Sequence, residues 1–139
     1  EIFLFAIDQG MKFLCANPDI VVDRGSVRQW CAGALAKMYT EMGGESLYFG
    51  KPHSAIYDLA RLRLADLSTK ITDKKILAIG DGINTDIEGA NSEGIDSLFI
   101  TGGLAAKETK TSINPNSEAL NQYIKEQKVT CTYSIGYLR

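Results

Sequence analysis

Cysteine and histidine are scarce in this sequence of 139 residues. The cysteines, Cys15, Cys31 and Cys131, are odd in number and show no Cys-x-x-Cys spacing, and there is a single histidine. A disulfide framework needs paired cysteines, and a structural zinc site needs closely spaced ligands. We therefore expect neither, and we expect the free thiols of a protein of the reducing cytoplasm.

Basic blocks and long apolar runs are absent as well. The 15 Lys and Arg against 17 Asp and Glu give a formal charge of −2, so nucleic acid is not an expected partner. The apolar stretch over residues 2–7 is far shorter than the roughly 20 residues of a membrane span, so no membrane partner is expected. No Gly-x-Gly-x-x-Gly dinucleotide fingerprint or Walker loop occurs either.

What the sequence does contain is an alternation of helical and strand patterns. Apolar residues recur at helical spacing over residues 26–42, with Ser26 as the predicted N-cap and Trp30 on the inner face. Residues 76–79 form an unbroken apolar run, typical of a strand buried in a parallel sheet. The other predicted elements are helices over 2–9, 52–67, 85–94 and 117–127, and strands over 11–16, 47–49, 97–100 and 129–133.

This order predicts an α/β fold with three layers, right-handed crossovers and a mostly parallel sheet. A capping box, Thr85-x-x-Glu88, is expected to open the helix over 85–94. Two stretches interrupt the alternation. Residues 17–25 are predicted to be an irregular hinge between domains, and residues 107–116 the longest loop.

Charged residues follow two of the predicted strands. Gly50-Lys51-Pro52 follows one strand, and the segment Gly80 to Asp86, which reads GDGINTD, follows another. Lys51 and Asp81 are 30 residues apart, the length of one βαβ unit, so both are expected at the same edge of the sheet, where ligands bind in such folds. Two nearby carboxylates repel each other unless a cation is shared, and Mg²⁺ prefers such oxygen ligands.

A simpler interpretation exists for each of these residues. Asp81 and Asp86 are also common turn and cap residues, although the combination of three strand ends, with Thr101-Gly102-Gly103 as the third, favours a site. The single histidine, His53, stands in the first turn of a predicted helix, where a solvated or capping role is favoured over a catalytic one.

These segments resemble motifs of the haloacid-dehalogenase-like hydrolases. Gly50-Lys51-Pro52 resembles motif III, and GDGINTD over residues 80–86 resembles motif IV. Residues 15–19, CANPD, are similar to a segment of the class IIA subgroup, which contains p-nitrophenyl-phosphatase-like enzymes. The resemblance extends from about residue 11 to residue 101 and implies a Rossmann-like core with an inserted α/β cap. It places residues 1–25 at the end of the cap and residues 26–139 in the core.

The resemblance also implies a Mg²⁺-dependent phosphatase that works through an aspartyl-phosphate. By this similarity Lys51 steadies the nucleophile and the phosphate, Asp81 binds the metal, and Asp86 orients a metal-bound water or Lys51. Gly82 and Asn84 are implied in phosphate binding. The predicted hinge residues are Asn17 and Asp19. The expected substrate is a small phosphorylated metabolite.

One part of the family pattern has no match. The nucleophile motif, an apolar strand followed by DxDG, should precede the cap, and Asp8-Gln9-Gly10 lacks its second aspartate. We therefore expect a C-terminal fragment that is inactive alone, with surface exposed by the missing strand that favours self-association. The alternative is a non-enzymatic pseudo-hydrolase that binds metal or phosphate without turnover.

Overall fold

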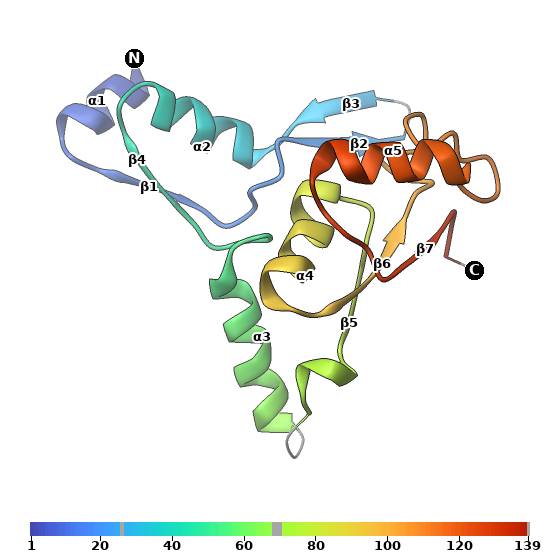
Figure 1. The fold of residues 1–139 in the computed structure, drawn as a ribbon. Helices are drawn as coiled ribbons and strands as arrows, with labels where there is room; N and C mark the ends of the chain where they lie inside the picture. The colour runs from blue at the N-terminus through green and yellow to red at the C-terminus, as the bar shows by residue number, and fades with distance from the viewer. Residues whose placement is uncertain (26, 68–70, 139) are drawn as a thin grey trace. The chain divides into compact units, whose positions relative to one another are not determined.

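Apart from three consecutive strands near the N-terminus, helices and strands alternate through the described residues, 1–25, 27–67 and 71–138 of the computed structural model (Figure 1). The helices are α1 (Ile2–Asp8), α2 (Ala32–Glu41), α3 (Ser54–Leu67), α4 (Glu88–Glu93) and α5 (Ser117–Gln127). The strands are β1 (Lys12–Cys15), β2 (Val21–Arg24), β3 (Val27–Trp30), β4 (Glu45–Tyr48), β5 (Leu77–Gly80), β6 (Asp96–Ile100) and β7 (Tyr133–Ile135). Two short turns, η1 (Asp73–Lys75) and η2 (Ile83–Ile87), flank β5. Among these strands only β2 and β3 pair antiparallel, which confirms the α/β class with mostly parallel sheets.

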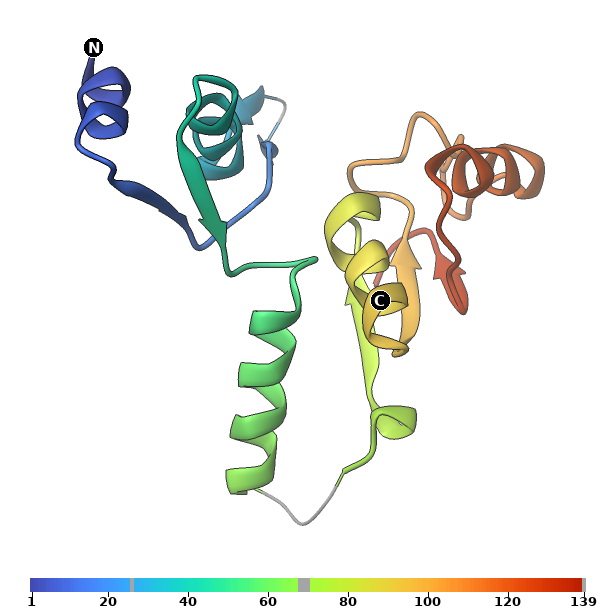
Figure 2. The same ribbon diagram turned by 60° about the vertical axis from the view of Figure 1, so that its left-hand side comes forward.

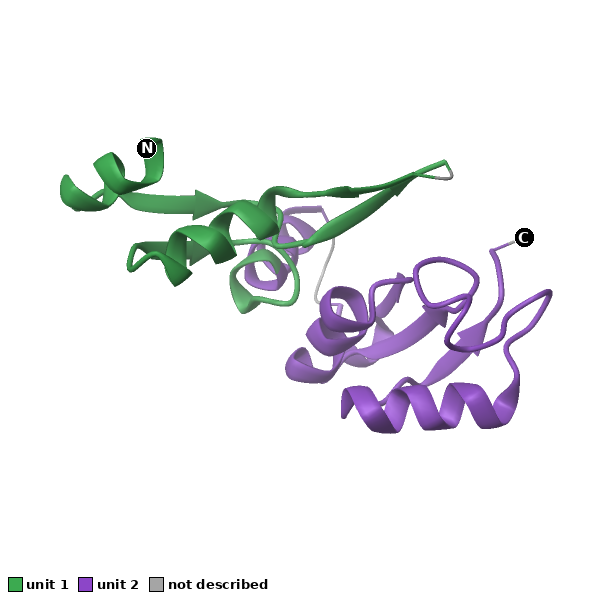
Figure 3. Ribbon diagram, turned by 90° about the horizontal axis from the view of Figure 1, so that it is seen from above, with its two compact units in different colours: residues 1–56 green, residues 57–139 purple. Residues whose placement is uncertain are grey.

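The chain divides into two compact units, residues 1–56 and residues 57–139 (Figure 3). The sequence predicts that residues 1–25 belong to a cap domain and residues 26–139 to a core domain. The division into two compact units does not decide this assignment, which stays a prediction. None of the helices in the described residues is long and apolar enough to cross a membrane.

In the first unit, α2 packs against the parallel pair β1–β4. Its Tyr39 is almost fully buried and donates its hydroxyl to the Met11 carbonyl at 2.5 Å. The Tyr39 ring also packs on Phe3 and Phe13, with ring centroids 5.3 and 5.5 Å apart. Such pairs stabilise a fold beyond the apolar area they bury. One tyrosine therefore links α1, α2 and β1.

Residues 27–30 form strand β3, so the predicted helix over 26–42 is wrong at its N-terminal end. Strands β2 and β3 make a hairpin in which Asp23 stands opposite Arg28, and their side chains form a salt bridge of 2.9 Å. Trp30, expected on a buried helix face, is 76% exposed. Apolar residues three positions apart fit a helix, but here the cross-strand partners decide the structure.

The predicted hinge over residues 17–25 is not irregular throughout, since it contains β2. It also fixes the start of α2, because the Gly33 N–H donates to the Asp19 carbonyl at 3.0 Å. A Cβ on Gly33 would lie 2.7 Å from that same oxygen, so a side chain would not fit there. Helix α2 begins at Ala32, and Ser26, the predicted N-cap, lies outside the described residues.

In the second unit the parallel sheet runs in the order β5–β6–β7 (Figure 2). Phe99 in β6 is fully buried in a cluster with Ile87 of η2 and Leu120 of α5. Both elements therefore cover the face of the sheet on which Phe99 lies. The predicted helix over 117–127 is confirmed as α5.

The opposite face of this sheet is far more open. Alternation along the strands places Leu77, Ile79 and Tyr133 on the face away from Phe99, as the strand register confirms. These three side chains are 44%, 51% and 58% exposed. The sheet thus leaves part of an apolar face in contact with solvent.

The last strand starts at Tyr133, later than the predicted segment over 129–133. The reason is a side chain of α4. Asn91 accepts the N–H of Thr130 at 2.8 Å and donates to its carbonyl at 2.7 Å. These bonds occupy backbone groups of Thr130 that a strand would use for pairing.

The predicted capping box at Thr85 does not form. The chain instead makes the π-helical turn η2, which starts from Gly82 as N-cap. The Gly82 carbonyl accepts the N–H groups of Thr85, Asp86 and Ile87 at 2.8 to 3.3 Å. The predicted end of the following helix is confirmed, because Gly94 adopts the left-handed conformation at φ +65°.

Candidate active site

The carboxylate of Asp86 is buried in the turn that follows β5. It is 9% exposed, and its Oδ2 accepts the N–H of Gly82 at 3.0 Å. A Cβ on Gly80 would lie 2.5 Å from the Asp86 Cβ, so only glycine lets the strand end approach this side chain so closely. A charge-assisted bond from the backbone holds the carboxylate in a defined orientation.

Asp81 is half-buried and contacts the loop that follows β6. Its Oδ2 accepts the N–H of Leu104 at 3.2 Å. A Cβ on Gly103 would lie 2.6 Å from the Asp81 Cβ, so this glycine is also required by close approach. The sequence marks the Thr101-Gly102-Gly103 strand end, but it does not show that the loop beyond it contacts Asp81.

The donor set of this turn fits Mg²⁺. Asp81 and Asp86 supply two carboxylates within one turn, and Mg²⁺ is usually bound by one or two carboxylates together with water and phosphate oxygens. Within the described ranges, no three His, Cys, Asp or Glu side chains gather into a cluster that could hold a metal alone. The turn therefore suits a hydrated hard cation better than a metal enclosed by protein ligands.

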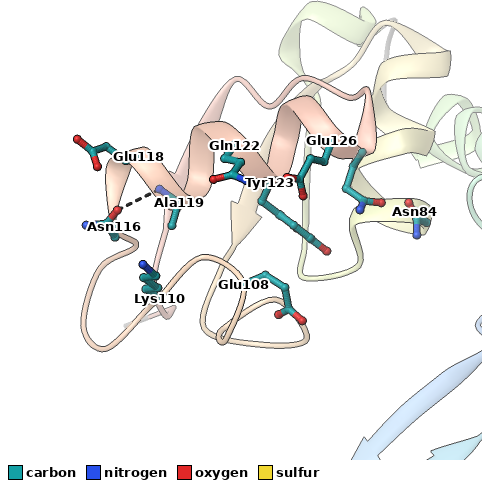
Figure 4. Close-up of a pocket in the computed structure, with 10 residues that line it drawn as sticks. Asn84, Glu108, Lys110, Asn116, Glu118, Ala119, Gln122, Tyr123 and Glu126 are labelled. Carbon is teal, nitrogen blue, oxygen red and sulfur yellow. Dashed lines mark hydrogen bonds between the residues drawn. The ribbon is translucent and has the colours of Figure 1, made fainter.

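The two predicted phosphate-binding residues occupy different surroundings. Gly82 is buried, and its N–H already donates to Asp86. Asn84 is exposed and lies at one end of a pocket of about 610 Å³ beside α5 (Figure 4). Their role in phosphate binding stays a prediction.

The charge of this pocket does not suit a phosphate. Of the described residues that line it, Glu108, Glu118 and Glu126 are negatively charged and Lys110 is positively charged (Figure 4). Burial raises the pKa of the Tyr123 hydroxyl, which also lines the pocket, and the negative charge of Glu108 adds to the rise. Because a dianion would be repelled here, the strand end suits a phosphate better than this pocket does.

Lys51 belongs to the first unit and is exposed, directly after the buried Gly50. A Cβ on Gly50 would lie 2.7 Å from the Ala16 carbonyl oxygen, so the turn packs tightly against the CANPD segment. His53 is exposed and stacks on Tyr48 with ring centroids 5.1 Å apart, which agrees with the non-catalytic interpretation. The convergence of Lys51 with the aspartates of the second unit stays a prediction.

The predicted hinge residues form a local turn in the first unit. The Asn17 Oδ1 accepts the N–H of Asp19 at 3.2 Å, and its Nδ2 donates to the Cys31 sulfur at 3.4 Å. The nearby Cys15 thiol is buried, and burial raises its pKa, so it is not an activated nucleophile. A hinge function for Asn17 and Asp19 stays a prediction.

Comparison with known proteins identifies the family of the chain. The family model described as HAD-hydrolase-like matches residues 48–126, more than half of the chain. A dihydroxyacetone phosphatase of Corynebacterium glutamicum (strain R) is 26% identical over 97 residues, 69% of this chain and 34% of the relative. The 5'-nucleotidase YutF of Bacillus subtilis (strain 168) is 30% identical over 109 residues, 76% of this chain and 40% of the relative.

A solved structure shows the same architecture. A hydrolase of the haloacid dehalogenase-like family from Brucella suis 1330 superimposes with a TM-score of 0.75 at 34% identity. The match covers 99% of this chain and 48% of that one. The chain thus spans about half of that structure and between 34% and 40% of the two curated relatives. The predicted Rossmann-type α/β fold is confirmed.

Proposed function

Because the chain belongs to the haloacid-dehalogenase-like hydrolase family, we propose that it is the C-terminal part of a Mg²⁺-dependent phosphatase. The observation that carries this proposal is the turn after β5. There Asp81 and Asp86 are each bound by a backbone N–H, from Leu104 and Gly82 respectively. Two relatives are named as a phosphatase and a nucleotidase, which supports a small phosphorylated metabolite as substrate.

Each residue has a distinct role in this proposal. Asp81 would hold Mg²⁺, which supplies charge neutralisation at the phosphoryl oxygens when bound. Asp86 fixes the turn through its bond with Gly82 and orients the groups around the phosphate. Lys51 contributes a positive charge to the phosphate and to the attacking carboxylate. Phosphoryl transfer depends mainly on such positioning and charge neutralisation.

We propose that Asp8 is not the nucleophile of the aspartyl-phosphate chemistry. That residue ends helix α1, whereas the nucleophile of the family motif follows an apolar strand. We propose that a DxDG segment outside these 139 residues supplies it, so that the 139-residue chain has no turnover alone. A pseudo-hydrolase that binds metal without turnover is the alternative.

A magnesium titration tests the metal site directly. In the ¹⁵N-labelled chain, the amides of residues 80–86 should shift at millimolar MgCl₂ while those of the β2–β3 hairpin stay in place. The site assignment is wrong if residues 80–86 do not move.

Turnover of p-nitrophenyl phosphate separates the two functional interpretations. We expect none from the chain alone, and Mg²⁺-dependent turnover once a longer form with DxDG is expressed. A longer form with DxDG that binds Mg²⁺ and still fails to hydrolyse phosphomonoesters favours the pseudo-hydrolase. Turnover by the short chain that Asp8→Asn abolishes would assign the nucleophile to Asp8.

Two further features bear on the cellular location and the self-association of the protein. The cysteines Cys15, Cys31 and Cys131 are all free thiols, which supports a cytoplasmic location. The exposed Leu77, Ile79 and Tyr133 support self-association through the open face of the β5–β7 sheet. Light scattering on the chain and on Ile79→Lys tests this, with a smaller mass expected for the variant.

A further inference from the structure

The loop that follows β6 contacts the proposed metal-binding carboxylate through its backbone. The Leu104 N–H donates to the Asp81 Oδ2 at 3.2 Å, and Gly103 leaves no room for a side chain between the loop and Asp81. This hydrogen bond requires the loop to hold the Leu104 N–H within reach of the Asp81 carboxylate. Whatever fixes this loop therefore fixes the direction in which Asp81 points.

Three threonine hydroxyls hold the loop in place. Thr109 and Thr101 are fully buried, and Thr111 joins them. The Thr111 hydroxyl donates to the Thr101 Oγ1 at 2.9 Å, and the Thr101 hydroxyl donates to the Ile135 carbonyl at 3.2 Å. The Thr109 Oγ1 lies 2.7 Å from the Thr111 Oγ1 and 2.7 Å from the Ala105 carbonyl oxygen.

This chain of hydroxyls joins three separate parts of the second unit. Thr101 stands directly after β6 and bonds to β7, whereas Thr109 and Thr111 come from the far side of the loop. Ala105, to which Thr109 bonds, is buried and follows Leu104 directly. The loop is thus bound to the sheet at the residue next to the one that contacts Asp81.

We propose that Thr109 is a positioning residue for Asp81, acting through Ala105 and the Leu104 N–H, with Gly103 providing the necessary close approach. This inference rests on the proposed Mg²⁺ site at Asp81. Removing the hydroxyl of Thr109 breaks its bonds to Ala105 and Thr111, while the Thr109 N–H still donates to the Ala105 carbonyl at 2.9 Å. The loop is loosened, so Asp81 keeps its charge but its direction is less firmly fixed. Groups that orient a metal ligand in this way commonly change metal affinity by about 10- to 100-fold.

Mg²⁺ affinity, followed by the amide shifts of residues 80–86, tests the role of Thr109. We expect Thr109→Val to weaken Mg²⁺ binding by about 10-fold or more, and Thr109→Ser, which keeps the hydroxyl, to restore it. Thr132→Val is the matched control, because Thr132 binds Ser97 and Asp96 at the other end of β6. It should lower the melting temperature without weakening Mg²⁺ binding.

A second measurement needs no metal. Hydrogen exchange at the Leu104 amide should be faster in Thr109→Val than in the unmodified chain, and unchanged in Thr132→Val. If Thr109→Val does not fold, Thr111→Val takes its place, because Thr111 is half-buried and its hydroxyl bonds to those of Thr109 and Thr101. We expect the same loss of Mg²⁺ affinity from this variant.

The outcomes separate this inference from the proposed function. If the unmodified chain binds Mg²⁺ at residues 80–86 and both Thr109→Val and Thr111→Val bind it equally well, the positioning role is wrong and the metal site stands. If the unmodified chain shows no binding there, the metal site itself is wrong. A loss of affinity in Thr132→Val as large as that in Thr109→Val would reduce the hydroxyl chain to a general structural role and overturn the inference.

Discussion

The two compact units hold their proposed functional residues in different ways. In the second unit, Asp81 and Asp86 receive bonds from the backbone, and the turn between them is continuous with the apolar cluster around Phe99. In the first unit, Lys51 is exposed on a turn, and the largest buried side chain is Tyr39. The carboxylates are therefore preorganised by the core, whereas the lysine owes little of its position to burial.

Loss of the central side chain of the second unit should have the largest effect. Phe99→Ala removes a fully buried ring and should lower the free energy of unfolding of this unit by about 3–5 kcal/mol. Urea unfolding followed by amide signals of β6 measures it, and the amide signals of β1 and β4 report on the first unit. If both probes shift together, the two units unfold as one and the contrast between them fails.

The next largest effect concerns the metal site. Asp81→Asn keeps the shape of the side chain but removes its charge, so the Mg²⁺-dependent shifts of residues 80–86 should disappear. His53→Ala is the control in the first unit, and it should leave Mg²⁺ binding unchanged because His53 packs on Tyr48. Unchanged Mg²⁺ affinity in Asp81→Asn would contradict the role of Asp81 as a ligand.

A smaller effect is expected at the centre of the first unit. Tyr39→Phe keeps the ring contacts with Phe3 and Phe13 but leaves the Met11 carbonyl without its hydroxyl partner. We expect a loss of about 0.5–1.5 kcal/mol in the free energy of unfolding, measured by the amide signals of β1 and β4 in urea. Tyr133→Phe, on an exposed strand residue, is the control, and equal effects of the two variants would show that the hydroxyl bond contributes nothing.

The smallest effect is a pH dependence of the β2–β3 hairpin. Hydrogen bonds from Arg28 lower the pKa of Asp23, so the pair stabilises the hairpin above the ordinary aspartate pKa of about 3.9. This contribution is lost as the pH falls through the lower pKa of the folded state. Because the pair is exposed, we expect only a modest change in the hairpin amide shifts at acidic pH. Arg28→Ala should move that change to higher pH, and an unmoved midpoint would argue against the pair.

Sequence patterns predicted where most helices and strands lie, but not which segments they pair with. The helix over 117–127 and the strand over 97–100 were predictable because their apolar periodicity has one interpretation. Residues 27–30 were not, because Val27 and Trp30 fit a helical face as well as a strand, and only the pairing of Asp23 with Arg28 across the hairpin decides between them. The π-helical turn η2 was also missed, since the Gly82 carbonyl that accepts three N–H groups leaves no sequence pattern.

The sequence by itself determined which candidate functional residues the chain contains. The segments Gly50-Lys51-Pro52 and GDGINTD over residues 80–86 specify a lysine and two aspartates after strands, because those residue types and that spacing are written in the chain. Only the tertiary structure decided how the aspartates are held. The contact between Leu104 and Asp81 and the hydroxyl chain through Thr109 join residues 23 and 8 positions apart in sequence. Such contacts depend on the exact path of a loop over the sheet, which local propensity and spacing do not encode.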